Sequence, residues 1–149
     1  MSFHIHLQPH VHAMKKITPL LTVDEIEPCL RFWTERIGFE VTVTVPHEDS
    51  LGFAILHRDG LELMYQSRAS IDADLVASGA PTGLGQEMAS GTSTLFIEVD
   101  ALDDVIGVLG DTEVLVPRRT TFYGMDEIFV RPPCGTVVGF AARVETGEA

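Results

Sequence analysis

The sequence contains two short segments that resemble each other. Leu21-Thr-Val-Asp-Glu-Ile26 resembles Ile97-Glu-Val-Asp-Ala-Leu102, and the two copies begin 76 residues apart, at positions 21 and 97. In each copy an apolar run typical of a strand ends at Val-Asp, and an amphipathic helical pattern follows. This spacing is longer than the ~20–50 residues of solenoid repeats. The repeat therefore predicts two copies of one supersecondary unit.

A helical pattern follows the first copy. Asp24 is the predicted N-cap residue, and Gly38 is the residue expected to end the helix. The apolar positions between them recur every three or four residues and form one stripe, made of Ile26, Leu30, Trp33 and Ile37. We expect this stripe to face the core, with Trp33 buried in it.

Strand patterns surround this helix. They cover residues 17–23, 40–45, 51–57 and 61–66. An Asp-Gly pair at positions 59 and 60 predicts a tight hairpin between the last two strands. The first half is therefore expected to fold as β-α-β-β-β.

The second copy repeats this order. The helix is predicted to begin after an N-cap at Asp100 and to end at Gly110, with an apolar stripe of Leu102, Val105, Ile106 and Leu109. Strands are predicted at residues 93–99, 113–117, 127–131 and 136–142. The fold class predicted for the whole chain is therefore α+β.

These patterns divide the chain into one domain with two short ends. We expect the domain at 15–143, with module one at 15–66, a connection at 67–92 and module two at 93–143. The connection is rich in Ala, Ser and Gly, with a short helix expected near 72–76. Residues 1–14 form a histidine-rich extension and residues 144–149 a tail.

Composition limits the function. The chain has 149 residues, 45 % of them hydrophobic, which is enough for one packed core. A formal net charge of −12 argues against nucleic acid as a partner, because phosphate binding needs clustered Lys and Arg. The sequence has no apolar run near the ~20 residues of a membrane helix, and no signal-peptide pattern, so we expect a cytoplasmic protein. Cys29 and Cys134 stand in no metal-binding pattern and are expected to be reduced thiols.

Two motifs carry a resemblance to a known family. Arg31-Phe-Trp-Thr-Glu-Arg-Ile-Gly-Phe39 looks like an aromatic pair followed by Leu-Gly-Phe, and Gly124-Met-Asp-Glu-Ile-Phe-Val-Arg-Pro-Pro-Cys-Gly135 looks like a closing strand and turn. Both are similar to motifs of the vicinal-oxygen-chelate superfamily, which includes glyoxalase I, extradiol dioxygenases, fosfomycin-resistance enzymes and bleomycin-resistance proteins. The resemblance implies two βαβββ modules that form a cupped mixed sheet around a cavity.

The resemblance also implies where a metal would bind. The ligand positions of metal-dependent members, on the first and last strand of each half, fall at Thr18, Glu62, Thr94 and Gly139. Only Glu62 is a usable ligand, whereas Zn, Ni or Fe would need three or four N, O or S donors. We therefore expect no metal at this site and no cofactor.

Among the branches, the bleomycin-resistance proteins are the most similar, although they usually have Asp where this chain has Pro132. They bind a cationic drug in the clefts of a dimer without altering it. The resemblance implies metal-independent binding of a small cationic or aromatic molecule by a homodimer. The alternative is a glyoxalase- or dioxygenase-type enzyme with a divalent metal, and a third hypothesis is an isomerase that uses Glu62 as its base.

The residues expected to line the cavity come from both halves: Thr18, Glu62, Met64, Gln66, Thr94, Phe96, Phe122, Tyr123 and Glu127. Met64 and Gln66 follow Glu62 at the two-residue period of a strand and so share its face. The loop with Phe122 and Tyr123 is expected to act as a lid or to pack against the domain. Glu127 is expected to reach the cavity or to pair with Arg131.

Two further features of the sequence are a group of histidines near the N-terminus and an adjacent pair of arginines. His4, His6, His10 and His12 could chelate a metal adventitiously from one strand face, or they belong to an extension upstream of a start at Met14. Arg118 and Arg119 are adjacent and, in a strand, point to opposite faces. We expect them to be a solvated pair.

Overall fold

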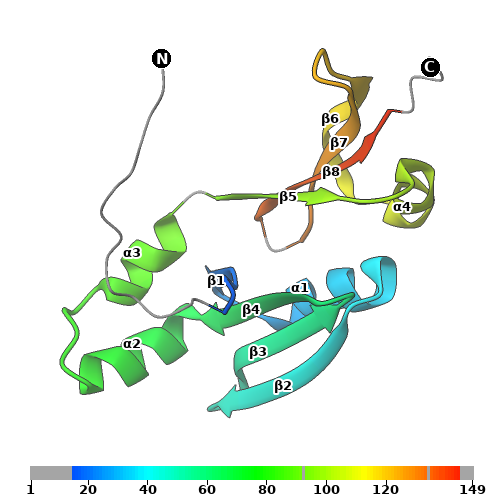
Figure 1. Cartoon of the computed structure of the whole chain (residues 1–149). Helices are drawn as coiled ribbons and strands as arrows, with labels where there is room; N and C mark the ends of the chain where they lie inside the picture. The colour runs from blue at the N-terminus through cyan, green and yellow to red at the C-terminus, as the bar shows by residue number, and fades with distance from the viewer. Residues whose placement is uncertain (1–14, 92, 134, 145–149) are drawn as a thin grey trace, which may run out of the picture.

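The computed structural model describes residues 15–91, 93–133 and 135–144, and it consists of two similar modules (Figure 1). The histidine-rich segment and Cys134 lie outside these residues. The elements of module one are β1 (Leu20–Val23), α1 (Glu27–Arg31), η1 (Phe32–Ile37), β2 (Glu40–His47), β3 (Ser50–Arg58) and β4 (Leu61–Ser67). Those of module two are β5 (Thr94–Glu98), α4 (Leu102–Leu109), β6 (Glu113–Thr120), β7 (Met125–Arg131) and β8 (Val137–Arg143). The predicted α+β fold with two βαβββ modules is confirmed.

Each module forms a four-stranded mixed sheet. The strand orders are β1-β4-β3-β2 and β5-β8-β7-β6, so the first and last strands of each module are parallel neighbours. The other strand pairs in both sheets are antiparallel. Asp59 and Gly60 both have positive φ, at 52° and 79°, which confirms the hairpin predicted between β3 and β4.

One face of the first sheet packs against its helix. Alternate residues of β3 and β4 are buried there, including Leu56, Leu63 and Tyr65. Trp33 is 1 % exposed, as predicted, and its indole Nε1–H donates to the Tyr65 hydroxyl at 2.9 Å. The helix is α-helical up to Arg31, continues as the π-helical segment η1, and ends at Gly38, whose φ of 85° is the left-handed conformation expected there.

Both predicted N-caps are wrong. The cap positions are Ile26 for α1 and Ala101 for α4, and neither receives a side-chain cap hydrogen bond. Asp24 instead pairs with Arg68 at 2.8 Å. The sequence pattern predicted the start of each helix to within a few residues. The Asp24 carboxylate, however, forms an ion pair with Arg68 and does not cap the helix.

The connection is more ordered than its composition suggests. It contains two helices, α2 (Arg68–Ala77) and α3 (Leu84–Ser90), of which only the first overlaps the short helix expected at 72–76. Ser67 caps α2 by accepting a hydrogen bond from the Ser70 backbone N–H. The two helices pack against each other, with the Gly85 backbone N–H donating to Asp72. None of the helices in the described ranges is long and apolar enough to cross a membrane.

The modules meet through their helix-bearing sides. Arg36 of η1 reaches α4, where it donates to the Val108 carbonyl and pairs with Asp111 at 2.8 Å. Buried apolar residues of both modules belong to one core, from Phe39 in the first to Phe140 in the second. Each sheet has a second face, which points away from the helices and which we call its open face. The open faces are therefore not buried between the modules.

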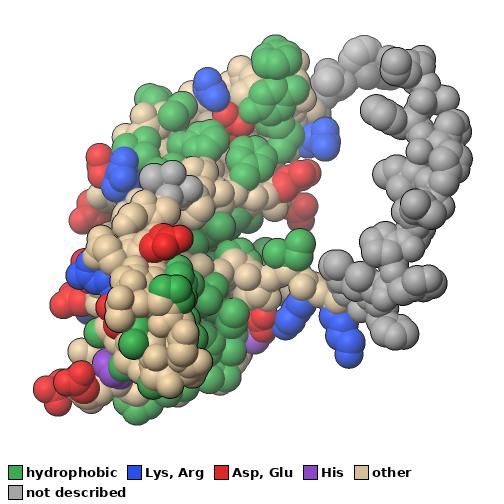
Figure 2. All heavy atoms as spheres, turned by 90° about the vertical axis from the view of Figure 1, so that its left-hand side faces the viewer, with side chains coloured by type: hydrophobic (Ala, Val, Ile, Leu, Met, Phe, Trp, Pro, Cys, Tyr) green, Lys and Arg blue, Asp and Glu red, His purple; other side chains and the backbone are tan. Residues whose placement is uncertain are grey.

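The open faces are built from matching rows of residues. In the first sheet the cross-strand register joins Leu20, Met64, Ile55 and Val43. In the second sheet it joins Phe96, Gly139, Phe129 and Val116. Several of these side chains are exposed, with Leu20 at 37 %, Val43 at 41 % and Phe96 at 51 %. Figure 2 shows apolar side chains reaching the surface on both modules.

Candidate functional site

Glu62 is the centre of a polar cluster at the start of β4. Its carboxylate accepts a hydrogen bond from the Thr18 hydroxyl at 2.6 Å and lies 2.8 Å from the Lys16 ammonium. The second carboxylate oxygen lies 2.7 Å from Nε2 of His57. The side chain is only 13 % exposed, so these three neighbours supply most of its polar contacts. The predicted proximity of Thr18 and Glu62 is thus observed.

These contacts set the charge of the cluster. The hydrogen bond from Lys16, and then that from Thr18, lower the pKa of Glu62 from 4.5 to about 2, with a smaller contribution from His57 and against the opposing effect of burial. Glu62 is therefore ionised at neutral pH. Because an ionised carboxylate only accepts hydrogen bonds, His57 must carry a proton on Nε2.

His57 is the functional candidate that sequence reasoning missed. It lies opposite Glu62 in the antiparallel pair β3–β4, three residues before the hairpin residue Gly60. Thr42, which is left out of the β2–β3 register at a bulge, places its hydroxyl 2.9 Å from Nδ1 of His57. The signal was available, because residues that flank a tight hairpin symmetrically are cross-strand neighbours.

Met64 and Gln66 follow Glu62 on the first open face, as predicted. Met64 pairs with Leu20 and Gln66 with Thr22. The Thr22 hydroxyl is buried and has no hydrogen-bond partner among the described residues. This face therefore offers apolar contacts from Met64 and a polar group from Gln66, with the Thr22 hydroxyl buried beneath it.

The second open face is aromatic. The rings of Phe96 and Phe129 lie 6.1 Å apart at an angle of 40°. Phe129 lies over Gly139, where a Cβ would come within 2.6 Å of its ring. The glycine is thus required for the ring to lie flat against β8, which gives Gly139 a packing role.

The register corrects one of the sequence assignments. In the first sheet Thr18 contacts Glu62, and two residues later Leu20 pairs with Met64. In the second sheet Thr94 pairs with Val137, whereas Gly139 pairs with Phe96. Val137 is therefore the structural counterpart of Glu62, and it offers an apolar side chain where a ligand would be needed.

Glu127 forms a second polar cluster. It is fully buried, and it accepts hydrogen bonds from Arg119 at 2.8 Å and from the Tyr123 hydroxyl at 3.0 Å. Its partner is thus not Arg131, which lies 3.7 Å from Glu113. The ion pair of Glu127 with Arg119 compensates a charge that would otherwise be costly to bury.

The aromatic pair next to this cluster lies at the surface. Phe122 is 100 % exposed and Tyr123 is 51 % exposed, with their rings in edge-to-face contact at 5.1 Å. Phe122 therefore does not pack against the described part of the domain, whereas Tyr123 of the same loop contacts it through Glu127, and a lid role for the loop stays a prediction.

Arg118 and Arg119 do point to opposite faces, but they are not simply solvated. Arg118 pairs with Asp103 of α4 and Asp126, while Arg119 pairs with Glu127 on the open face. The hydrogen bonds with Arg118 lower the pKa of Asp126, and those with Asp126 and then Asp103 raise the pKa of Arg118. Arg118 thus fastens α4 to the sheet, and only Arg119 belongs to the site.

Five of the nine predicted site residues fall into two groups. Thr18, Glu62 and Phe96 line a cavity of ≈ 250 Å³ between the start of module one and β5, together with Lys16 and Leu61. Tyr123 and Glu127 form the other group, in module two. The other four, which are Met64, Gln66, Thr94 and Phe122, are not among the residues that line this cavity. Within the described ranges, no three His, Cys, Asp or Glu side chains lie close enough to hold a metal ion.

Comparison with known proteins identifies the fold. No family model matches the sequence, and no curated protein does. Solved structures do match. A glyoxalase/bleomycin resistance protein/dioxygenase from Nocardioides is similar over 93 % of this chain and 89 % of its own, with a TM-score of 0.66 and 19 % identity.

Two other solved structures show how varied the named functions are. A lactoylglutathione lyase from Agrobacterium tumefaciens has a TM-score of 0.68 at 13 % identity, over 89 % of this chain and 96 % of its own. TnmS3, an antibiotic binding protein from Streptomyces sp. CB03234, has a TM-score of 0.62 at 15 % identity, over 90 % of this chain and 99 % of its own. The chain thus has the glyoxalase/bleomycin-resistance fold, which confirms the predicted resemblance at the level of the fold.

Proposed function

We propose that this protein binds a small organic molecule on its open sheet faces, without a metal and without altering it. The observation that carries the proposal is that each open face combines exposed apolar side chains with a carboxylate held by neighbouring donors. On the first face the carboxylate is Glu62, and on the second it is Glu127. Apolar surfaces with a few placed polar groups are typical of ligand sites.

The side chains favour an aromatic or cationic ligand. Phe96 and Phe129 offer ring faces for stacking. A cationic group could exchange with Lys16, which is 63 % exposed, for contact with Glu62. The antibiotic-binding protein among the structural neighbours supports this class of function.

A homodimer is part of the proposal. Both open faces expose apolar side chains, and β2 and β6 are edge strands of their sheets. Exposed apolar patches and sheet edges are usually covered by a partner. Two copies related by a two-fold axis could cover the first open face of one with the second open face of the other. Sedimentation should give a dimer at micromolar concentration, and a clean monomer would contradict this part.

The metal-dependent alternative is not favoured by the donor set. His57 adds a second metal-capable side chain beside Glu62, but both carboxylate oxygens are already engaged by Lys16, Thr18 and His57. A bound divalent ion would lie beside the Lys16 ammonium, which repels it. The isomerase hypothesis is also weakened, because a carboxylate with a pKa of about 2 is a poor base at neutral pH.

Ligand screening tests the proposal. Thermal shift with cationic glycopeptides, aromatic acids and thiol conjugates should reveal a stabilising class, since a ligand at about a hundredfold its Kd adds ~2.7 kcal/mol of stability. For a cationic hit, Glu62→Gln should weaken binding by more than about tenfold in calorimetry, as a charge-assisted contact becomes neutral. The exposed Glu87→Gln is the matched control. Equal affinities in all three proteins would exclude Glu62 from the site.

Metal analysis separates this proposal from the enzyme alternative. Protein that begins at Met14 should contain no stoichiometric Ni, Zn or Fe. Metal in that protein would overturn metal-independent binding. Metal that is present in the full chain and lost on removal of residues 1–13 would belong to the histidine-rich segment.

A further inference from the structure

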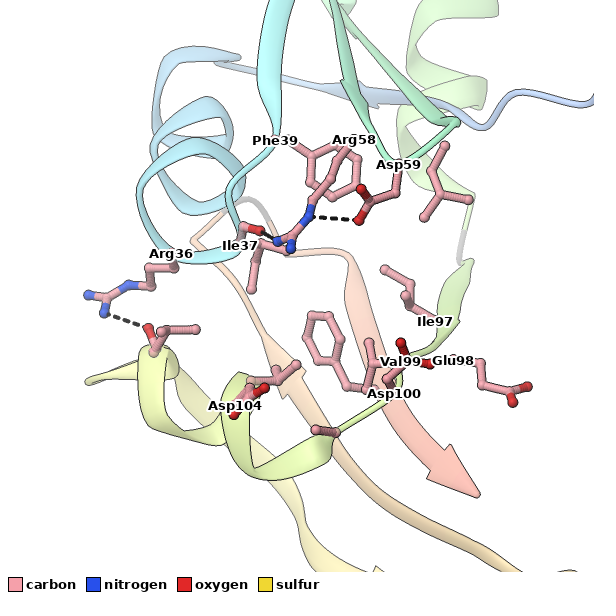
Figure 3. A pocket seen from close by; sticks show the side chains of 15 residues that line it. Arg36, Ile37, Phe39, Arg58, Asp59, Ile97, Glu98, Val99, Asp100 and Asp104 are labelled. Carbon is pink, nitrogen blue, oxygen red and sulfur yellow. Dashed lines mark hydrogen bonds and ion pairs between the residues drawn. The ribbon is translucent and has the colours of Figure 1, made fainter. Parts of the chain in front are cut away.

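A larger cavity lies between the modules, on the side of the helices. It measures ≈ 670 Å³, within the usual ligand range of ~300–1,000 Å³. Figure 3 shows that η1 and the β3–β4 turn form one wall, and that β5 and α4 form the other. We call this cavity the inter-module cleft. None of the residues predicted as the site lines it.

The cleft has an apolar lining. Ile37 and Phe39 contribute from the first module, and Val99 and Phe140 from the second. Ile37, Phe39 and Phe140 are each less than 9 % exposed, so their positions are fixed by the core. The cleft can therefore receive an aromatic or aliphatic group between two preformed walls.

The two arginine side chains beside the cleft, Arg36 and Arg58, already have hydrogen-bond and ion-pair partners. Arg58 donates to the Ile37 carbonyl and pairs with Asp59 at 3.0 Å. Arg36 crosses to Asp111 of the other module and passes over Gly110, where a Cβ would overlap its guanidinium. Both guanidinium groups are thus held by partners at the margin of the cleft.

The acidic residues of the cleft are less engaged. Asp59, Glu98, Asp100 and Asp104 line it, and Figure 3 shows Asp59 on the opposite wall from Asp100 and Asp104. Across the described ranges, Asp100 and Asp104 make no ion pair or side-chain hydrogen bond. The lining therefore contains four carboxylates and two arginine side chains that already have partners. Asp100 and Asp104 add two unpaired negative charges beside the apolar lining.

We propose that the inter-module cleft is a second binding site, which takes a small organic ammonium ion. Its hydrocarbon part would lie against the apolar lining to which Phe39 and Phe140 contribute, and its ammonium group would lie near the carboxylates of Asp100 and Asp104. A neutral ligand of the same shape would forgo the charge contacts, and an anion would be repelled. Because the two walls belong to different modules, the bound ion would also tie the modules together. The cleft shares Phe39, Leu61 and Ile97 with the smaller cavity beside Glu62, and the two sites differ in the carboxylates that they offer.

Trp33 can report on this site through its neighbour Phe39, and because Trp33 itself lines the cavity beside Glu62, the Glu62→Gln variant is needed to separate the two sites. Trp33 is the single tryptophan of the chain, and its ring lies 5.1 Å from that of Phe39 in an edge-to-face contact. A ligand that packs against Phe39 alters the surroundings of this pair. Fluorescence of Trp33 should therefore change as the cleft fills.

The experiment is a titration with 2-phenylethylammonium, using the full chain and Trp33 fluorescence, with 2-phenylethanol as the neutral probe. The amine should bind about fivefold or more tightly than the alcohol, as expected for two exposed charge contacts. The variant Asp100→Asn/Asp104→Asn should lose this difference. The variant Asp49→Asn/Asp74→Asn removes two exposed carboxylates away from the cleft, and it should bind like the wild type.

Four results would overturn the inference. The first three are equal binding of amine and alcohol, equal losses in the two double variants, and no response of Trp33 up to millimolar amine. Binding that survives Asp100→Asn/Asp104→Asn but is lost in Glu62→Gln would assign the amine to the Glu62 cluster instead. That last outcome would support the open-face function while refuting the second site.

Discussion

Tyr65→Phe tests the hydrogen bond between Trp33 and Tyr65, which lies on the buried side of the first sheet, opposite its open face. The substitution removes one oxygen atom, which accepts a hydrogen bond from Trp33 Nε1 at 2.9 Å. Trp33 is 1 % exposed and Tyr65 0 %, so water cannot replace the lost acceptor without opening the core. A buried donor left without a partner costs about 1–3 kcal/mol.

This cost is measurable. For a chain of this length, about 1–3 kcal/mol corresponds to a fall in Tm of roughly 3–9 °C. Urea unfolding should be followed by far-ultraviolet circular dichroism and by Trp33 fluorescence, and the two transitions should coincide. The slope of the free energy of unfolding against urea should not change, because the fold is retained.

A double-mutant cycle separates the energy of the hydrogen bond from the loss of unfolding free energy that each single substitution causes for other reasons. Trp33→Phe removes the donor, and the double variant removes both partners. The coupling energy should be about 0.5–1.5 kcal/mol, the net value of a typical hydrogen bond. Additive effects, or a loss below about 0.5 kcal/mol in Tyr65→Phe, would refute a structural role for this contact.

Three further predictions concern stability. The pKa of Glu62 is lowered from 4.5 to about 2, so the folded state binds fewer protons than the unfolded state between these values. Its contribution to stability is therefore full above pH 4.5 and is lost as the pH falls to 2, and Glu62→Gln should reduce the acid sensitivity of unfolding in that window. Gly139→Ala should cost about 1–3 kcal/mol in urea unfolding, because the new Cβ meets the ring of Phe129, and a neutral effect would contradict the close packing. Gly110→Ala should lower Tm, since φ is 58° there and the Cβ would displace Arg36, and an unchanged Tm would show that the contact between modules is dispensable.

The sequence determined the local structure of both modules. The repeat at positions 21 and 97 predicted two equivalent units, and each unit has the expected strand, helix and three strands. Gly38 and the Asp59-Gly60 pair were predictable because they adopt positive φ, which few other residues do. The core position of Trp33 followed from helical periodicity. These features depend on neighbours in sequence, which is why a pattern can reveal them.

The ordered connection was harder to predict. Helix α2 buries Ile71 but little else, so its apolar periodicity is weak. It is held by the Ser67 cap and by contacts with α3, which has no strong pattern of its own. Short helices that depend on a neighbour for stability leave little trace in composition.

The chemistry of the site was decided by tertiary structure. His57 becomes a partner of Glu62 only through the β3–β4 register, and Arg119 becomes a partner of Glu127 through the β6–β7 register. A two-residue period shows which face a side chain occupies but not which residue lies opposite, because register depends on turns and bulges. The inter-module cleft depends on how two modules pack, and neither half of the sequence contains that information alone. The sequence by itself therefore determined the units and their faces, whereas the pairing of charges and the cavities between the units arose only from the assembled fold.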